Sequence, residues 1–234
     1  VGAEDTTSTL RGGVYAELAM FDIDLFNCLE IMDGLRNTTR DFCFVTLGEF
    51  QTFADRLLRT VGAVHAAGWI HNDVKPENVG LWQINGRHRM DTAVLFDFGH
   101  ARQISAPPLC HGTRAYLPPE GNPTAVSQFP DGYDHRAKDA FALGITLLVA
   151  WYVARRIKDD TPWCFNDGSS PTFLAGRHDR MERIQSRRMD APLRLEYELL
   201  RLVDPDWTKR PCIEVARAAI RSAAAPSVPV LAGP

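Results

Sequence analysis

The sequence has few lysines, no closely paired cysteines and no very long apolar stretch. Its only lysines are Lys75, Lys138, Lys158 and Lys209, its formal net charge is -3, and its arginines are scattered, so no basic surface for nucleic acid is indicated. The five cysteines include no C-x-x-C pair, so they predict neither a zinc site nor a disulfide framework. The longest apolar run, 141–154, is shorter than the roughly 20 residues of a membrane span, and we expect a buried core helix there.

What is present is the composition of a folded domain. With 234 residues, of which 45% are hydrophobic and 24% charged, the chain can bury a substantial core and is expected to form one globular domain. Residues 1–10 lack the basic start of a secretory signal, and the small and prolyl residues 224–234 look like a tail. Nothing in the sequence distinguishes a cytoplasmic from a secreted protein.

The hydrophobic periodicity predicts an α+β domain that is mainly α-helical. An apolar run at 13–20 is expected to be a strand, and a helical pattern opens at Asp24. Thr46 and Glu49 have the spacing of a capping box, and apolar residues then recur at helical intervals as far as Gly68. An irregular segment is expected at 158–177, and further helices at 138–157, 181–188, 193–203 and 212–223.

Two short apolar runs, 78–83 and 92–98, predict a small antiparallel hairpin. Asn85 and Gly86 between them suit the positive φ angles of a tight turn. The stretch that follows, 105–132, is rich in proline and glycine. Because it is too long for a simple connection, we expect it to be functional.

A polar octapeptide, residues 71–78, separates the long helix from the hairpin. Its sequence, His-Asn-Asp-Val-Lys-Pro-Glu-Asn, resembles the catalytic loop H-R-D-x-K-P-E-N of protein kinases in all but one residue. The resemblance implies that Asp73 is the catalytic base, that Lys75 balances charge on the transferred phosphoryl group, and that Asn78 helps to hold magnesium. It implies a structural role for His71. Turn-forming residues assembled by chance would not explain the order and spacing of the motif.

A second motif of the same family follows the hairpin. Asp97, Phe98 and Gly99 match the metal-binding sequence D-F-G. The resemblance implies that Asp97 and Asn78 are the two protein ligands of magnesium. D-F-G alone would be a weak signal, but its position just past the hairpin that follows the octapeptide makes it specific.

Residues 112–120, Gly-Thr-Arg-Ala-Tyr-Leu-Pro-Pro-Glu, resemble the substrate-docking segment G-T-x-x-Y-x-A-P-E, with Pro118 in place of alanine. The resemblance implies that Thr113 hydrogen-bonds near the catalytic base. It also implies that Glu120 forms a buried ion pair with Arg210, the arginine of a later Asp-Pro…Arg-Pro pattern. We expect this pair to be structural, and its loss to be costly because the surviving charge is left unpaired.

Three further resemblances complete the pattern. Asp139 opens an apolar helix in a sequence similar to D-x-W-S-x-G, which implies that it accepts backbone N–H bonds from the octapeptide. A surface aspartate favoured by the helix dipole is the alternative. Residues 16–19 resemble the hinge, so Glu17 and Ala19 are expected to bind adenine through their backbone groups. Asp24 is expected to bond the ribose.

The resemblance covers 13–223 and departs from the family at two places. Before the hinge there is no G-x-G-x-x-G and no lysine, so no residue in this chain can clamp ATP as the family's lysine does. Three explanations stay open: a fragment of a longer kinase, a small lobe supplied or replaced by another segment, or a pseudokinase. Asn72 replaces the arginine that pairs with a phosphorylated activation loop, so we expect packing rather than phosphate to hold that loop. A phosphate bound by Arg102 and Arg114 is the alternative.

The resemblance as a whole implies the large lobe of a Ser/Thr protein kinase. Its expected parts are a remnant of small-lobe strands at 1–16, a hinge at 17–24, the large lobe at 25–223 and the tail at 224–234. The implied activity is transfer of phosphate from ATP, with Mg2+, to a protein substrate by the full-length parent, and we expect this chain alone to perform it poorly. A pseudokinase that binds a protein partner is one alternative. A small-molecule phosphotransferase, which shares H-x-D-x-x-x-x-N but lacks the 112–120 segment, is another.

Overall fold

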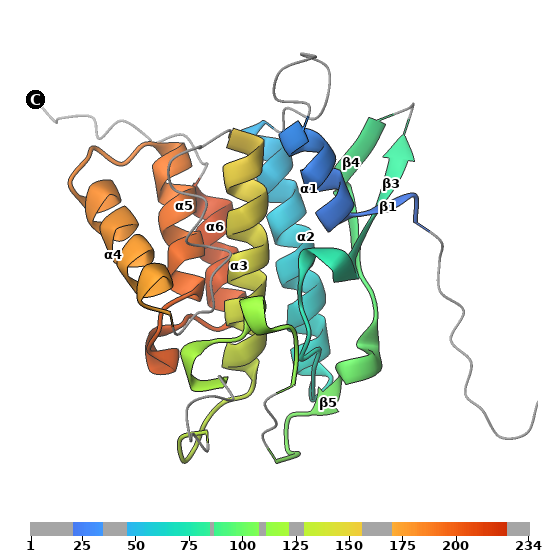
Figure 1. The fold of residues 1–234 in the computed structure, drawn as a ribbon, viewed down its shortest axis with the longest axis vertical. Helices are drawn as coiled ribbons and strands as arrows, with labels where there is room; N and C mark the ends of the chain where they lie inside the picture. The colour runs from blue at the N-terminus through green and yellow to red at the C-terminus, as the bar shows by residue number, and fades with distance from the viewer. Residues whose placement is uncertain are drawn as a thin grey trace, which may run out of the picture.

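The computed structural model describes residues 21–34, 46–84, 87–107, 111–121, 129–155 and 170–223. Within these ranges the chain forms six α-helices and two small antiparallel sheets (Figure 1). The α+β fold, mainly helical, that the periodicity predicts is thereby confirmed.

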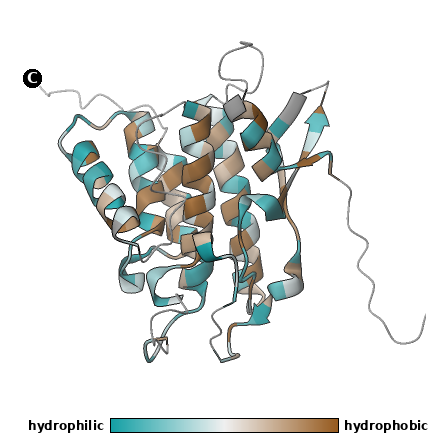
Figure 2. Cartoon of the chain, viewed as in Figure 1, coloured by the Kyte–Doolittle hydropathy of each residue, from teal (hydrophilic) through white to brown (hydrophobic). Residues whose placement is uncertain are grey.

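Helix α3 (Arg136–Arg155) is the central element of the fold. All of its residues from 138 to 152 are buried, and Figure 2 shows the helix as apolar along most of its length. Helices α1 (Leu25–Gly34), α2 (Leu47–Ala66) and α5 (Ala191–Leu202) pack against it. By length and composition alone α3 could cross a membrane, but 89% of its apolar window is buried by the rest of the fold, as in the core helix of a globular domain.

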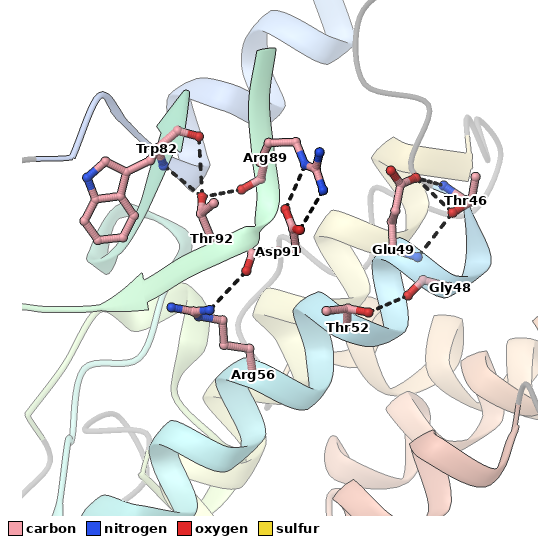
Figure 3. A network of polar contacts seen from close by, with 9 residues as sticks. All are labelled: Thr46, Gly48, Glu49, Thr52, Arg56, Trp82, Arg89, Asp91 and Thr92. Carbon is pink, nitrogen blue, oxygen red and sulfur yellow. Dashed lines mark hydrogen bonds and ion pairs between the residues drawn. The ribbon is translucent and has the colours of Figure 1, made fainter. Parts of the chain in front are cut away.

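Helix α2 begins at the capping box that the sequence predicts. The backbone N–H of Thr46 donates to Glu49 Oε2 at 2.8 Å, and the backbone N–H of Glu49 donates to Thr46 Oγ1 at 3.2 Å (Figure 3). Two donors of the first helical turn are satisfied in this way. The apolar face of α2 contacts α3, strand β4 (Arg87–Leu95) and helix α6 (Ile213–Ala223).

The larger sheet has the strand order β1-β3-β4, in which β1 (Ile23–Asp24) and β4 pair antiparallel with β3 (Val79–Ile84). The smaller sheet pairs β2 (Trp69–Ile70) with β5 (Arg102–Gln103). Both sheets are short, and the helices provide most of the core.

The two sheets hold two motif-bearing segments next to each other. We call residues 71–78 the polar loop and residues 97–99 the D-F-G turn. The polar loop connects β2 to β3, and the D-F-G turn connects β4 to β5. β2, before the polar loop, pairs with β5, after the D-F-G turn. β3, after the polar loop, pairs with β4, before the D-F-G turn. The sheets therefore fix both ends of both segments.

A register shift interrupts the hairpin between Gly80 and Trp82. Thr92 fills the irregularity, because its Oγ1 accepts the backbone N–H of Trp82 at 2.9 Å and donates to the Arg89 carbonyl at 2.5 Å (Figure 3). From α2, Arg56 donates to two backbone carbonyls of β4 at 2.7 and 3.2 Å. The irregular part of the hairpin is thus tied to the long helix.

The structure corrects several boundaries. Strand β4 begins at Arg87 rather than at Thr92, because a largely polar stretch without apolar alternation extends the pairing toward the end of the hairpin where β3 connects to β4. Helix α4 (Pro171–Gln185) begins inside the segment expected to be irregular at 158–177. Ser170 caps it by accepting the Phe173 N–H at 3.1 Å, and proline in the first turn is a normal helix start. The expected strand at 13–20 and the tail lie outside the described residues.

Glu196 of α5 is a buried carboxylate that joins three helices. Arg180 of α4 donates to it through Nε and, at 2.8 Å, through Nη2. From α3, the Tyr152 hydroxyl donates at 2.9 Å and the Trp151 indole N–H at 3.4 Å. The Glu196 side chain is only 2% exposed, so these donors replace nearly all of the water that it loses on folding.

We expect Arg180→Met to lower the free energy of unfolding by about 3–5 kcal/mol, because the buried carboxylate of Glu196 is left without its cation. Urea denaturation measures this loss. Arg217→Ala is the control, because it removes a partly exposed ion pair with Asp55 and should cost less than about 1 kcal/mol. Equal losses in the two variants would contradict the assignment of Arg180 and Glu196 as a buried pair.

Candidate active site

The polar loop is anchored to the helical core through Asp139, near the start of α3. Its Oδ1 accepts the backbone N–H of Asn72 at 2.8 Å, and its Oδ2 accepts that of His71 at 2.7 Å. The Nε2 of His65, in the last turn of α2, lies 3.0 Å from the same Oδ2. Asp139 is fully buried, so these bonds compensate for its loss of solvation. The loop backbone therefore takes its position from α3, whose Asp139 is in turn held by α2 through His65.

The ring of His71 connects the polar loop to the D-F-G turn. Its Nε2 lies 2.9 Å from the Phe96 carbonyl, and since a carbonyl only accepts, Nε2 carries the proton. This tautomer leaves Nδ1 to accept the backbone N–H of Asp73 at 3.4 Å. The ring of Phe98 packs on the imidazole with centroids 4.7 Å apart. His71 thus sets the spacing between the two segments.

Asp73 lies at the centre of a bonded cluster. Its Oδ1 accepts both the backbone N–H of Thr113 at 2.8 Å and the Thr113 hydroxyl at 3.0 Å. Its Oδ2 lies 2.9 Å from Lys75 Nζ and 3.3 Å from Asn78 Nδ2. Lys75 also donates to Thr113 Oγ1 at 2.8 Å. The structure therefore brings together the four residues to which the resemblance gives catalytic roles.

The charge of Asp73 is stabilised by these contacts. Burial raises the pKa of Asp73, but the hydrogen bonds from Lys75 and Thr113 and the positive charge of Lys75 together lower it further than burial raises it. The pKa consequently lies below its ordinary value, and the carboxyl is ionised at neutral pH. The site thus holds a paired carboxylate and ammonium.

Each of the two side chains that the resemblance implies as magnesium ligands has an oxygen that accepts no hydrogen bond from the described residues. Asn78 donates its Nδ2 to the Asp73 carbonyl at 2.9 Å, and no described residue donates to its Oδ1. Asp97 is exposed, has a left-handed φ of 58°, and receives through Oδ1 the Gly99 N–H at 3.2 Å. No group of three or more His, Cys, Asp or Glu side chains in the described ranges could hold a metal. Two oxygen ligands suit Mg2+, which also keeps waters and substrate phosphates.

Residues 112–120 pass over the polar loop at Gly112. The φ of Gly112 is 123°, which favours glycine, and a Cβ there would lie 2.9 Å from the Asn72 carbonyl oxygen. This close approach of the two backbones brings the Thr113 N–H within bonding distance of Asp73. A side chain at position 112 would separate them.

The far end of residues 112–120 is held by the ion pair that the sequence pattern predicts. The guanidinium of Arg210 binds both carboxylate oxygens of Glu120, one through Nη1 and the other through Nη2 at 2.8 Å. The Tyr133 hydroxyl donates to the same carboxylate at 2.9 Å, and the guanidinium carbon lies 4.9 Å from the centre of the Phe141 ring. The two charged side chains are 1% and 9% exposed, so the pair is buried.

The residues expected to bind the nucleoside are only partly described. Glu17 and Ala19 lie outside the described residues. Asp24 lies at the end of β1, opposite Gly80, and its carboxylate accepts the backbone N–H of Asn27 at 2.8 Å and the Asn27 amide at 2.6 Å. This carboxylate therefore caps the start of α1. Its role in binding ribose stays a prediction.

Two side chains that the sequence motifs do not assign to the site lie directly beside it. Asn72 has a positive φ of 71°, and its Nδ2 donates to the His100 carbonyl at 3.1 Å. Lys138, in α3, donates to Asn72 Oδ1 at 2.5 Å. The sequence signal for Lys138 is its position at the start of an apolar helix, directly before Asp139. Lysine is rarely buried unless it is paired, so a lysine at such a place predicts a partner nearby.

Comparison with known proteins identifies relatives of this chain. The family model described as protein kinase domain matches residues 17–196. The probable serine/threonine-protein kinase PkwA of Thermomonospora curvata is 33% identical over 105 residues, which are 43% of this chain and 12% of that protein. Serine/threonine-protein kinase D of Synechocystis sp. is 29% identical over 108 residues, 42% of this chain and 19% of that protein. Serine/threonine-protein kinase PKZ1 of Phytophthora infestans is 32% identical over 110 residues, 41% of this chain and 26% of that protein. The chain thus spans 12% to 26% of the length of these relatives.

We expect Gly112→Ala to lower the free energy of unfolding by about 1–3 kcal/mol, because alanine is strained at this φ and its Cβ meets the Asn72 carbonyl. Gly132→Ala is the matched control, since Gly132 has a φ of 74° but no neighbouring atom within 4 Å of the place that a Cβ would take. The loss of unfolding free energy in Gly132→Ala therefore measures the cost of the positive φ alone. Urea denaturation gives both values, and a loss for Gly112→Ala no larger than that for Gly132→Ala would exclude a tight backbone contact.

The pKa of the Asp73 carboxyl is expected to rise in Lys75→Met, because the variant loses both the hydrogen bond and the positive charge that lower it. In the wild type the folded pKa is below the unfolded one. Ionised Asp73 therefore stabilises the fold above the unfolded pKa, and this contribution is lost as the pH falls through the folded pKa. Carboxyl carbon chemical shifts followed from neutral to strongly acidic pH measure the change. Lys209→Met, which removes an exposed pair with Asp206, should leave the Asp73 titration unaltered.

Proposed function

Since the chain belongs to the protein kinase family, we propose that it is the large lobe of a serine/threonine kinase that, in the full-length protein, transfers the γ-phosphoryl group of ATP to a protein substrate. The observation that carries this proposal is the bonded cluster of Asp73, Lys75 and Thr113. The Ser/Thr class is supported by the names of the relatives and by the sequence Lys-Pro-Glu at 75–77.

Asp73 orients the substrate hydroxyl and takes its proton. A carboxylate whose pKa lies below its ordinary value is a weak base, so proton transfer comes late, when the new bond from the hydroxyl oxygen to the γ-phosphorus has formed far enough to acidify the hydroxyl. The bond from phosphorus to the departing ADP breaks in the same displacement. This timing suits the loose transition state of phosphoryl transfer.

Lys75 offsets the negative charge of the phosphoryl group in transit. Its ammonium is bonded to Asp73 and to the Thr113 hydroxyl, and its side chain is 20% exposed, so it is both oriented and accessible. A cation that is held in place before the substrate arrives needs no reorganisation during the reaction. Thr113 in turn holds Oδ1 of Asp73, which sets the direction in which the carboxylate can accept a hydroxyl proton.

Asp97 and Asn78 would hold magnesium, which when bound neutralises charge on the nucleotide phosphates. The exposed Asp97 and the Oδ1 of Asn78 support this assignment. Asp24, with the backbone of Glu17 and Ala19, would bind the nucleoside. Asp24 would then share its carboxylate between the ribose and Asn27.

Two other functions would use parts of the same site. A small-molecule phosphotransferase is disfavoured by the contact between Thr113 and Asp73 and by the Glu120–Arg210 pair, because that class lacks the segment that makes them. A pseudokinase that binds a protein partner would keep the same contacts without using nucleotide. Nucleotide binding and phosphate transfer therefore decide between a kinase and a pseudokinase.

The full-length protein is expected to incorporate labelled phosphate from ATP into a serine- or threonine-containing protein substrate when Mg2+ is present. Asp73→Asn should reduce kcat by about 10^2- to 10^4-fold, the usual effect of removing a general base. Asp97→Ala should lose Mg2+-dependent transfer, whereas Glu198→Gln, which changes only a surface pair with Arg201, should retain it.

Two results would count against this function. Equal incorporation by the wild type and by Asp97→Ala would show that the label does not come from this site. Absence of any Mg2+-dependent stabilisation by ATP in a thermal-shift measurement of the full-length protein would favour the binding module.

A further inference from the structure

Lys138 is a buried cation at the point where several segments of the site meet. It lies in the first turn of α3, and the residue is only 3% exposed. An ammonium removed from water is tolerated only where oxygen acceptors replace its hydration. The acceptors of Lys138 therefore indicate what this position stabilises.

The ammonium bonds to two segments outside α3. Lys138 Nζ donates a hydrogen bond to Oδ1 of Asn72 at 2.5 Å and another to the backbone carbonyl of His111. Asn72 in turn donates through Nδ2 to the His100 carbonyl at 3.1 Å. A continuous line of hydrogen bonds thus joins His111, α3, the polar loop and the residue that follows the D-F-G turn.

The charge at this place is distributed differently from the pattern that the family resemblance implies. There, an arginine at position 72 awaits a phosphate as its counter-charge. Here position 72 is a neutral amide, and groups of the chain itself occupy both its oxygen and its nitrogen. The cation stands on α3 instead, and the two bonds described above go to neutral oxygens. These two bonds therefore need no phosphate.

The ammonium of Lys138 already lies against the side chain at position 72. Burial lowers the pKa of His135, the charge of Asp134 raises it, and the charges of Arg102 and Lys138 lower it. A further cation at position 72 would lie beside the Lys138 ammonium, and two like charges at this distance repel each other. The asparagine at 72 and the lysine at 138 therefore depend on each other.

We propose that Lys138 is a positioning residue that holds residues 111–117 against the polar loop, so that Thr113 reaches Asp73 without phosphorylation of this stretch. The sequence predicts that packing holds the loop, and this inference adds a buried cation to the packing. Its consequence for phosphate transfer rests on the proposed function, but the placement of residues 111–117 does not.

Amide hydrogen exchange of the full-length protein tests the inference in Lys138→Met, in Asn72→Arg and in the double variant. Lys138→Met should speed exchange of the Thr113 and Tyr116 amides by about 10- to 100-fold, the size of a lost hydrogen bond to a charged group. Asn72→Arg should have a similar effect, because two cations then compete for one buried place. The double variant again has one cation and should return to within about threefold of the wild type.

The inference is overturned if the Thr113 amide exchanges at the wild-type rate in Lys138→Met, or if the double variant loses as much protection as the two single variants together. The amides of α5 and α6 serve as the internal reference for global unfolding. Should Lys138→Met fail to fold, Asn72→Gly replaces it, since glycine accepts the positive φ but removes the amide that Lys138 binds. Wild-type exchange of Thr113 in that variant would also reject the role of the network.

Phosphatase treatment of the wild type is the second measurement, and it should leave the exchange rates of Thr113 and Tyr116 unchanged. Faster exchange after treatment would mean that a phosphate holds the segment, and the inference would be wrong. Exchange requires no catalysis, so the two proposals can fail separately. A protein that shows the expected exchange pattern but transfers no phosphate contradicts the proposed function alone, and an active protein whose Lys138→Met variant keeps full protection contradicts this inference alone.

Discussion

The buried carboxylate of Asp139 is the contact on which the geometry of the site depends. It lies in the most deeply buried helix of the fold, and its two oxygens accept backbone N–H groups of consecutive residues of the polar loop. A buried charge of this kind is tolerated only when its bonds are complete, so the loop cannot move away without leaving the carboxylate unsatisfied. The position of Asp73, one residue further on, is therefore set by the hydrophobic packing of α3 rather than by the loop itself.

The carboxylates of Asp73 and Glu120 are likewise paired with donors from the chain itself. Lys75 and Thr113 stabilise the charge of Asp73, and Arg210 with Tyr133 stabilises that of Glu120. The first group is partly accessible and suited to chemistry, whereas the second is closed off and holds a segment in place. Both are ion pairs between a carboxylate and a cationic side chain, and they differ in how far solvent reaches the cation.

Local signals allowed most helices to be predicted from the sequence, and the family resemblance implied the cluster of Asp73, Lys75, Asn78 and Thr113. The capping box at Thr46, the continuous apolar run of α3 and the residue order of the polar loop are each contained in a short stretch of sequence. The paired strands β2 and β5 were not anticipated, because each has two residues and gains its partner only through the fold. The start of α4 does carry a local signal, because Ser170 is followed directly by Pro171, and the expectation of an irregular segment at 158–177 did not take it into account. Lys138 could not be assigned, because its partners lie 66 and 27 positions away and only the tertiary fold brings them together.

The long separation of paired residues also has a consequence for synthesis of the protein. Glu120 and Arg210 are 90 positions apart, whereas Asp73 and Thr113 are separated by 40. Closing a longer loop costs more entropy, and here it also requires that the later residue has been made. While the ribosome has not yet released Arg210, the segment that carries Thr113 lacks its far anchor. A nascent chain therefore contains Asp73, Lys75, Asn78 and Thr113 well before it can hold them in a stable arrangement. The site reaches its final geometry only when α5 and α6 have packed against the rest of the fold.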